Sequence, residues 1–232
     1  MPDNSGGQSI GLRDMVCGIA SLCGDIPTML RALPSAIPQL PTAKMSIGKR
    51  FAQNAHKFAD RDFLRFEGRS IAYREANEHA NRIADLLTRQ GISRGDVVAV
   101  LSRNHPDVVI TMLAIVKIGA IAGMLNFHQR GQVLEHSLGL IDAKIVVYQD
   151  DLFEALESVS NTARPPIEME FADLHRRATG CSSKNPAVTD TISADDTAFY
   201  IFTSGTTGYP KASKMSHYRW LAAMGGIGGF GI

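Results

Sequence analysis

The chain has 232 residues, which is enough for one large domain or two small ones and for a sizeable apolar core. Its 44% apolar and 20% charged residues are typical of a soluble globular protein. A net charge of +1 offers no electrostatic support for nucleic-acid binding, and the lack of an apolar run of about 18 residues argues against a conventional membrane span.

The first 43 residues differ in composition from the rest, because prolines and glycines occur in them at short intervals. Within them, residues 12–23 carry apolar side chains at helical spacing and predict a short helix. The polar face of this helix has only Arg13 and Asp14 as charges. This favours a helix packed on the main body, or a loosely ordered extension, over a helix that rests on a membrane. We therefore predict an N-terminal extension over residues 1–43 and a globular body over residues 44–232.

The body alternates short apolar runs with amphipathic helix patterns. Continuous apolar runs are typical of parallel strands that are buried on both faces. The predicted elements, in chain order, are a hairpin at 63–73, a helix from 76 to a stop at Gly91, a strand at 97–101, a helix from Pro106 to Gly119, a strand at 120–125, a helix at 132–140, a strand at 144–148, a helix at 151–160 and a strand at 167–171. This alternation predicts βαβ units in a doubly wound, mainly parallel α/β sheet with flanking helices. Residues 179–194 are small and polar, which predicts a surface connection.

The stretch that ends at Lys211 carries the prediction of function. Residues 198–202 favour a buried strand, and residues 203–208 that follow have no side chain larger than threonine. Because glycine tolerates positive φ angles, such a loop can turn consecutive backbone N–H groups inward. Four hydroxyls and one ammonium line the same concavity, and these converging donors predict a polyphosphate ligand. Residues 212–215 then predict a returning strand, and 217–224 the start of a helix.

The spacing of this loop differs from that of Walker A. Counted from Gly205, the sixth position is Pro210 where Walker A has glycine, and Ala212 stands where it has serine or threonine. The hypothesis of a P-loop NTPase therefore fails on the residues themselves.

Thr203-Ser204-Gly205-Thr206-Thr207-Gly208-Tyr209-Pro210-Lys211 resembles the Ser/Thr-Ser-Gly-Thr-Thr-Gly-x-Pro-Lys signature of the adenylate-forming superfamily. Gly95-Asp96-Val97-Val98 is similar to that family's Gly-Asp-x-Val strand, and residues 117–126 resemble its next helix–strand passage. Residues 126–130 are most similar to the long- and very-long-chain fatty acyl-CoA synthetases, a group that includes fatty acid transport proteins and mycobacterial members. The resemblance covers roughly residues 44–230.

The resemblance implies a fatty-acid–CoA ligase that works in two steps. A fatty carboxylate attacks the α-phosphate of ATP, and the thiol of coenzyme A then displaces AMP from the acyl-adenylate. Mg²⁺ is implied as the companion of ATP. The nucleotide phosphate-binding residues that the resemblance carries over are Thr203, Ser204, Gly205, Thr206, Thr207, Gly208 and Lys211.

The resemblance also implies that the catalytic residues lie outside this chain. Family members are more than twice as long, whereas this chain stops about twenty residues after Lys211. The expected identity is thus an N-terminal part of such a ligase, with little or no activity by itself. The alternative is a catalytically inactive truncated product, or a nucleotide-binding or interaction module.

The implied substrates are ATP and a long- or very-long-chain fatty acid, and the implied compartment is the cytoplasm. Peripheral contact with the inner face of the cell membrane is an open alternative. The sequence leaves the oligomeric state undetermined.

No metal site is predicted from the cysteines and histidines. Cys17, Cys23 and Cys181 are odd in number and lack C-x-x-C spacing, which favours reduced thiols. The seven histidines lack H-E-x-x-H spacing. We interpret His79 and His136 as surface or core residues of their helices.

Three other residues are assigned supporting roles. Asn126 and Arg130 are expected to stabilise a loop beside the sheet, with a binding role as the weaker alternative. Trp220 is expected to pack on the helix that follows the phosphate loop, with contact with an acyl tunnel as the weaker alternative.

Overall fold

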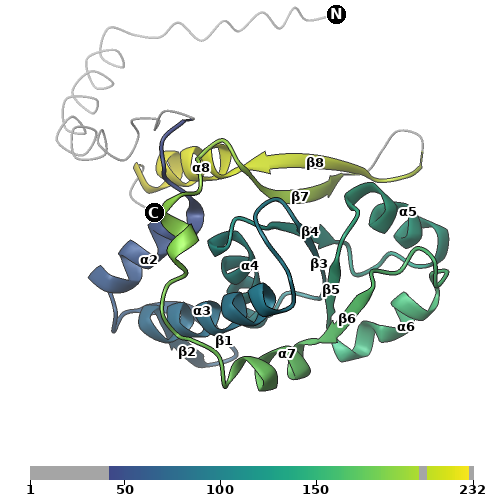
Figure 1. Ribbon diagram of the computed structural model, residues 1–232, viewed down its shortest axis with the longest axis horizontal. Coiled ribbons are helices and arrows are strands. Elements are labelled where there is room, and N and C mark those ends of the chain that lie inside the picture. Colours follow the sequence, from purple (N-terminus) through teal and green to yellow (C-terminus); the bar gives the residue numbers. More distant parts are fainter. Residues whose placement is uncertain (1–41, 204–207, 230–232) are drawn as a thin grey trace, which may run out of the picture. The chain divides into compact units, whose positions relative to one another are not determined.

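The computed structural model describes residues 42–203 and 208–229. The strands of its larger sheet are β3 (Val97–Leu101), β4 (Ile121–Leu125), β5 (Ile145–Tyr148), β6 (Ile167–Glu170), β7 (Thr197–Thr203) and β8 (Lys211–Ser216). In the described residues this sheet has six strands in the order β6-β5-β3-β4-β7-β8 (Figure 1). Neighbouring strands pair in parallel, except for β7 and β8, which are antiparallel. The expected mainly parallel sheet is confirmed.

Helices cover both faces of this sheet, as in a doubly wound fold. The helices on one face are α2 (Ile47–Lys57), α3 (Tyr73–Arg89), α4 (Pro106–Lys117) and α7 (Phe171–Ala178), and on the other α5 (Gly131–Ile141), η1 (Asp150–Leu152) and α6 (Phe153–Glu157). Central strand β3 is buried along its whole length. Val98 and Val100 belong to the first core cluster, while Val97, Ala99 and Leu101 belong to the second. Successive side chains of a strand point to opposite faces, so a continuous apolar run suits this position.

A separate hairpin joins α2 to α3. Its strands are β1 (Asp62–Phe66) and β2 (Arg69–Ala72), with Phe66 opposite Arg69. The two turn residues, Glu67 and Gly68, have φ angles of 48° and 76°. Positive φ at both central positions is the requirement of a type I′ turn, which matches the twist of the strands. The predicted hairpin is confirmed.

Several boundaries differ from the sequence-based expectations. Tyr73 and Phe171 start helices α3 and α7 and do not end strands. The predicted helix at 151–160 is shorter, because a 3₁₀ turn precedes the five-residue α6. Helices α2 and α7 were not anticipated, although Ser46 caps α2 by accepting the N–H of Lys49 at 3.1 Å.

The prediction for residues 179–194 was wrong in part. This segment contains η2 (Ala187–Asp190), and Thr189, Ile192 and Ala194 are buried. Its small side chains allow close packing against α4, where the Thr189 hydroxyl donates to the Lys117 carbonyl at 2.7 Å. Composition alone therefore underestimated its burial.

Of the described residues, 42–203 and 208–221 belong to one compact unit, and 222–229 are grouped with a second unit. The helix predicted at residues 12–23 lies outside the described residues. Helix α8 (His217–Gly229) follows β8 as expected, and the Trp220 ring lies 5.1 Å from that of Phe199. Trp220 is itself a residue of α8, and this contact packs the helix against β7. Within the described ranges, no helix combines the length and the apolar character needed to cross a membrane.

Candidate functional site

The predicted phosphate loop leaves the sheet at the carboxyl end of β7. Because β3 to β7 run parallel to one another, their carboxyl ends form a single edge of the sheet. Strand β7 ends at Thr203, beside the end of β4. In open α/β sheets, ligands bind outside the carboxyl ends of the strands. The fold therefore places Thr203, where the predicted loop starts, at the edge where such sheets hold their ligands.

The antiparallel pairing of β7 and β8 brings the two ends of the loop together. Thr203 lies opposite Lys211 in the register, and both side chains are exposed. Gly208 has a φ angle of 89°, a backbone conformation that favours glycine. The other four predicted phosphate-binding residues, Ser204, Gly205, Thr206 and Thr207, lie outside the described residues. The structure thus places one hydroxyl and the ammonium of Lys211 at the mouth of the loop.

Helix α5 holds the segment just before Lys211. His136 Nε2 donates to the Pro210 carbonyl at 3.2 Å, and the His136 and Tyr209 rings lie 4.9 Å apart. The Tyr209 hydroxyl is 3.5 Å from Gln132 Oε1. These contacts tie the downstream side of the loop to a helix that starts at the same sheet edge.

The turn between β4 and α5 is stabilised by the residues expected to do so. Arg130 donates to the carbonyls of Phe127 and Gln129, each at 2.8 Å. Asn126 Oδ1 accepts the N–H of His128 at 2.9 Å. The predicted supporting role of Asn126 and Arg130 is confirmed.

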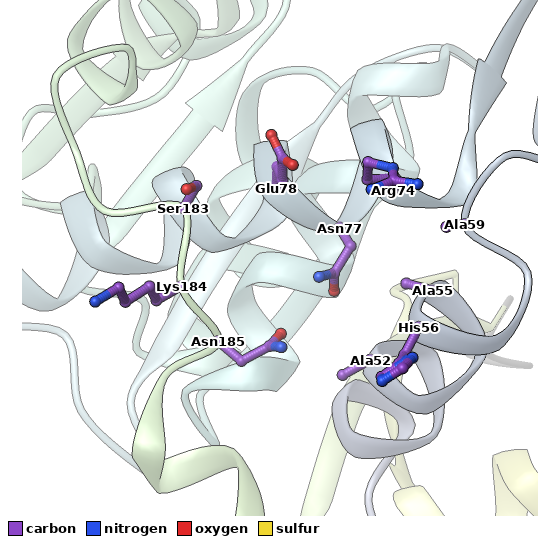
Figure 2. Close-up of a pocket in the computed structure, with 10 residues that line it drawn as sticks. All are labelled: Ala52, Ala55, His56, Ala59, Arg74, Asn77, Glu78, Ser183, Lys184 and Asn185. Carbon is purple, nitrogen blue, oxygen red and sulfur yellow. The ribbon is translucent and has the colours of Figure 1, made fainter.

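A buried lysine, which the sequence did not single out, joins three segments far apart in the chain. Lys117 has no exposed surface, and its Nζ donates to Oδ1 of Asn77, Asn81 and Asn185, each at 2.6 Å. Figure 2 shows Asn77 on α3 facing Asn185 on the later segment. Burial lowers the pKa of Lys117 to about 7. Three short contacts to acceptor oxygens nevertheless require three N–H donors, which only the ammonium form supplies.

Gly48 lets α2 pack against this lysine. A Cβ at Gly48 would lie 2.8 Å from Lys117 Cγ and 2.9 Å from Lys117 Cα. Because one of these atoms is backbone, Gly48→Ala is expected to lower the free energy of unfolding by about 1–2 kcal/mol, despite the better helix propensity of alanine. Urea unfolding measures the change. Gly139→Ala in α5 is the matched control, because a Cβ added at Gly139 would meet no neighbouring atom within 4 Å. This variant should raise the free energy of unfolding by up to about 1 kcal/mol. Destabilisation of the same size in both variants would contradict the packing argument.

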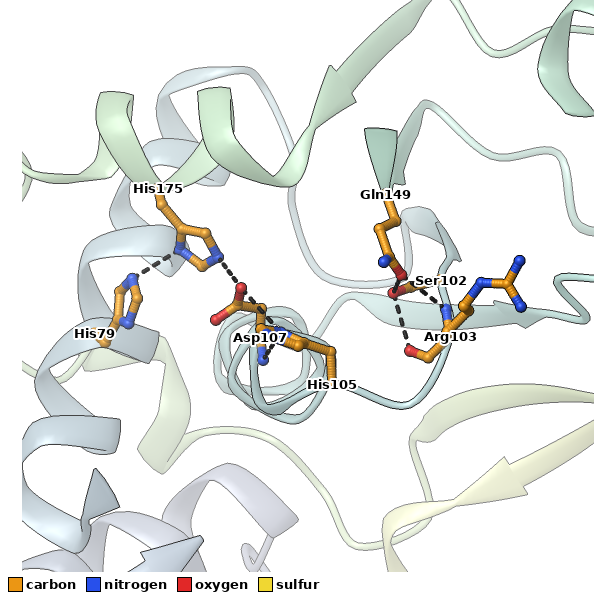
Figure 3. A network of polar contacts seen from close by, with 7 residues as sticks. All are labelled: His79, Ser102, Arg103, His105, Asp107, Gln149 and His175. Atoms are coloured by element: carbon orange, nitrogen blue, oxygen red, sulfur yellow. Dashed lines mark hydrogen bonds and ion pairs between the residues drawn. The ribbon is translucent and has the colours of Figure 1, made fainter. Parts of the chain in front are cut away.

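Polar contacts also join the carboxyl ends of β3 and β5. At this point the chain leaves β3 for α4 on one face of the sheet and leaves β5 for η1 and α6 on the other face. Gln149 Oε1 accepts the Ser102 hydroxyl at 3.0 Å and the Arg103 N–H at 3.1 Å (Figure 3). The Arg103 guanidinium donates to Asp151 at 3.0 Å and lies 5.0 Å from the centre of the Phe127 ring. Sequence reasoning missed this group, because its members share only their positions just after strands.

Three histidines and a carboxylate link α3, α4 and α7. His175 Nδ1 lies 2.8 Å from His79 Nε2, and His175 Nε2 lies 3.3 Å from Asp107 Oδ2 (Figure 3). His105 Nδ1 lies 3.1 Å from the same oxygen. The nearby His175 side chain holds the pKa of Asp107 below its ordinary value, and burial lowers the pKa of His79. Among the residues that the structure describes, no three His, Cys, Asp or Glu side chains are grouped so that they could hold a metal ion.

Comparison with known proteins identifies the family. The family model described as AMP-binding enzyme matches residues 51–230. The chain belongs to the AMP-binding enzyme family. It is 44% identical over 238 aligned residues to the medium/long-chain-fatty-acid–CoA ligase FadD6 of Mycobacterium tuberculosis, an alignment that covers 100% of this chain and 40% of FadD6. It is also 30% identical to the long-chain fatty acid transport protein 6 of Mus musculus, over 78% of this chain and 31% of that protein.

Solved structures of the family share this fold. A fatty acyl CoA synthetase of Mycobacterium tuberculosis superposes with a TM-score of 0.68 at 26% identity, over 77% of this chain and 36% of that structure. The NpsA N-terminal subdomain of Klebsiella oxytoca gives a TM-score of 0.63 at 28% identity, over 74% of this chain and 42% of the subdomain. The chain therefore corresponds to the N-terminal portion of the fatty-acid–CoA ligases that it matches, and spans about 40% of the length of FadD6.

Proposed function

We propose that this chain forms the ATP phosphate-binding part of a fatty-acid–CoA ligase. The observation that supports this most directly is the pairing of Thr203 with Lys211, which closes a glycine-containing loop at the carboxyl edge of the parallel sheet. Membership of the AMP-binding family and the names of the relatives, which specify fatty acids, support the same function.

In this proposal the loop binds the β- and γ-phosphates of ATP. Hydroxyl and backbone N–H groups of residues 203–208 donate to phosphate oxygens, and the Lys211 ammonium offsets their charge. This stabilises the negative charge that develops on pyrophosphate as a fatty carboxylate attacks the α-phosphate. Thr203 and Lys211 are exposed at the mouth of the loop, which fits an incoming polyphosphate. Mg²⁺ would enter with ATP and neutralise part of its charge.

The second step, transfer of the acyl group to coenzyme A, needs groups that this chain is not proposed to supply. We expect the 232-residue chain to show little or no formation of acyl-CoA by itself. The proposed compartment is the cytoplasm.

Replacing Lys211 tests the phosphate contact. Lys211→Ala should weaken ATP binding by roughly 10- to 100-fold, because a charge-assisted hydrogen bond contributes about 1.5–3 kcal/mol. Isothermal titration of the chain with ATP measures the loss. Lys214→Ala is the control, since Lys214 is an exposed lysine of the same strand, opposite Tyr200. Equal affinity in the chain and in Lys211→Ala would contradict the role of Lys211. No binding by either would mean that the loop needs the rest of the ligase.

A further inference from the structure

A cavity of about 600 Å³ lies between α2, α3 and the segment around Asn185 (Figure 2). None of these three elements carries the predicted phosphate loop. Asn77 and Asn185 line it, and both accept hydrogen bonds from the buried Lys117. The cavity thus opens directly onto the carboxamides that surround a buried positive charge.

That charge has no counterion within the described residues. Three neutral amide oxygens satisfy the three N–H donors of Lys117, but no described carboxylate forms an ion pair with it. Buried charges in proteins are normally paired with an opposite charge. An anion in the adjoining cavity would supply the missing negative charge, separated from the Lys117 ammonium by one asparagine side chain.

The asparagines also offer donors to such an anion. Because their oxygens are held by Lys117, the NH₂ groups of Asn77 and Asn185 diverge from the lysine, as the geometry of a carboxamide requires. In the described part of the chain neither NH₂ group has an acceptor, whereas that of Asn81 donates to the Ser183 carbonyl at 2.7 Å. The nearby ammonium polarises these amides and strengthens them as donors.

The rim of the cavity is mainly cationic. The cations Arg74 and Lys184 line it, and Glu78 is the one acidic residue among its described lining. Glu78 lies 3.4 Å from Arg82, and Arg74 contacts Asp60 at 2.9 Å. The Arg74 and Asp60 side chains are 61% and 88% exposed, so this ion pair is weak and leaves Arg74 available.

From these contacts we infer a second anion-binding site, distinct from the loop at residues 203–211, which takes a phosphate group. Two fixed amide donors and the cationic rim suit an oxyanion with several acceptor oxygens, which favours phosphate over a carboxylate. The group can be carried by a free phosphate ester or by a lipid headgroup, and the chemistry of recognition is the same for both.

The test compares thermal unfolding of the chain in inorganic phosphate and in chloride at equal ionic strength. Phosphate stabilises folded proteins in general, so the decisive quantity is the difference between the wild type and Asn185→Asp. In Asn185→Asp an isosteric carboxylate supplies the counterion and removes one NH₂ donor. The chain should still fold, and its Tm should rise with phosphate by about 2–4 °C less than that of the wild type.

Three further variants complete the design. Lys184→Glu, at an exposed position, should also reduce the rise of Tm with phosphate. Arg50→Glu, on an exposed position of α2 outside the cavity, should respond as the wild type does. Lys211→Ala should keep the full response, which separates this site from the proposed ATP site. An equal rise of Tm in the wild type, Asn185→Asp and Lys184→Glu would overturn the inference.

Sedimentation with vesicles distinguishes the two sources of the phosphate group. Binding to vesicles that contain phosphatidic acid, but not to phosphatidylcholine alone, supports a lipid headgroup if Asn185→Asp abolishes it. A phosphate-dependent Tm difference without vesicle binding supports a free phosphate ester. Absence of both effects overturns the site.

Discussion

Replacing Lys117 with methionine is expected to lower the free energy of unfolding by about 2–4 kcal/mol. The methionine side chain has a similar length but no donor, so three asparagine oxygens lose their hydrogen-bond partner. Asn81 is only 1% exposed and cannot recover the bond with water. Asn77 and Asn185 line the cavity, so water can reach their oxygens in the variant. The loss of stability is therefore smaller than for three asparagine oxygens that all stay buried without a hydrogen bond.

Urea unfolding measures this effect, with Lys144→Met as the matched control. The Lys144 side chain is 54% exposed, and its Nζ lies 2.7 Å from Asp96. An exposed ion pair of this kind contributes at most about 1 kcal/mol. If Lys117→Met is no less stable than Lys144→Met, the lysine does not hold the three segments together.

Acidification is expected to destabilise the fold through His217. This side chain is fully buried, and its Nδ1 accepts the N–H of Ile47 at 3.2 Å. Its Nε2 has no partner among the described residues. Burial lowers the pKa of His217 from 6.5 to about 4, with the charge of Asp196 opposing the shift.

The sign of the effect follows from proton linkage. Between pH 6.5 and about 4, the unfolded chain carries the proton at this position and the folded chain does not. The free energy of unfolding therefore falls as the pH falls through this window, by about 3 kcal/mol in total. Above pH 6.5 this group contributes no pH dependence.

His217→Asn should remove this pH dependence. The Oδ1 of asparagine can still accept the Ile47 N–H, but the side chain does not titrate. Urea unfolding of the wild type and the variant between pH 7 and pH 4.5 gives the two curves. His128→Asn, at an exposed position, serves as the control and should follow the wild type. Parallel curves for the wild type and His217→Asn would show that His217 does not govern the acid response.

The sequence by itself determined the elements whose signals are local. The apolar runs at 97–101, 121–125 and 145–148 became the central strands, and Pro106 starts α4 as expected. Their order along the chain was sufficient for a mainly parallel doubly wound sheet. The nine residues that end at Lys211 were sufficient to recognise the family. The roles of Ser204, Gly205, Thr206 and Thr207 in binding phosphate remain predictions.

Only the tertiary structure decided which polar side chains meet. Lys117 contacts asparagines 40, 36 and 68 residues away in the chain, and His217 contacts the backbone 170 residues away. Hydrophobic periodicity reports which face of an element is buried, but not which element covers that face. A lysine near the end of an apolar helix looks like an ordinary exposed cation until the fold places three asparagines around it. The pairing of Thr203 with Lys211 likewise depends on the register of β7 and β8, which long-range packing sets.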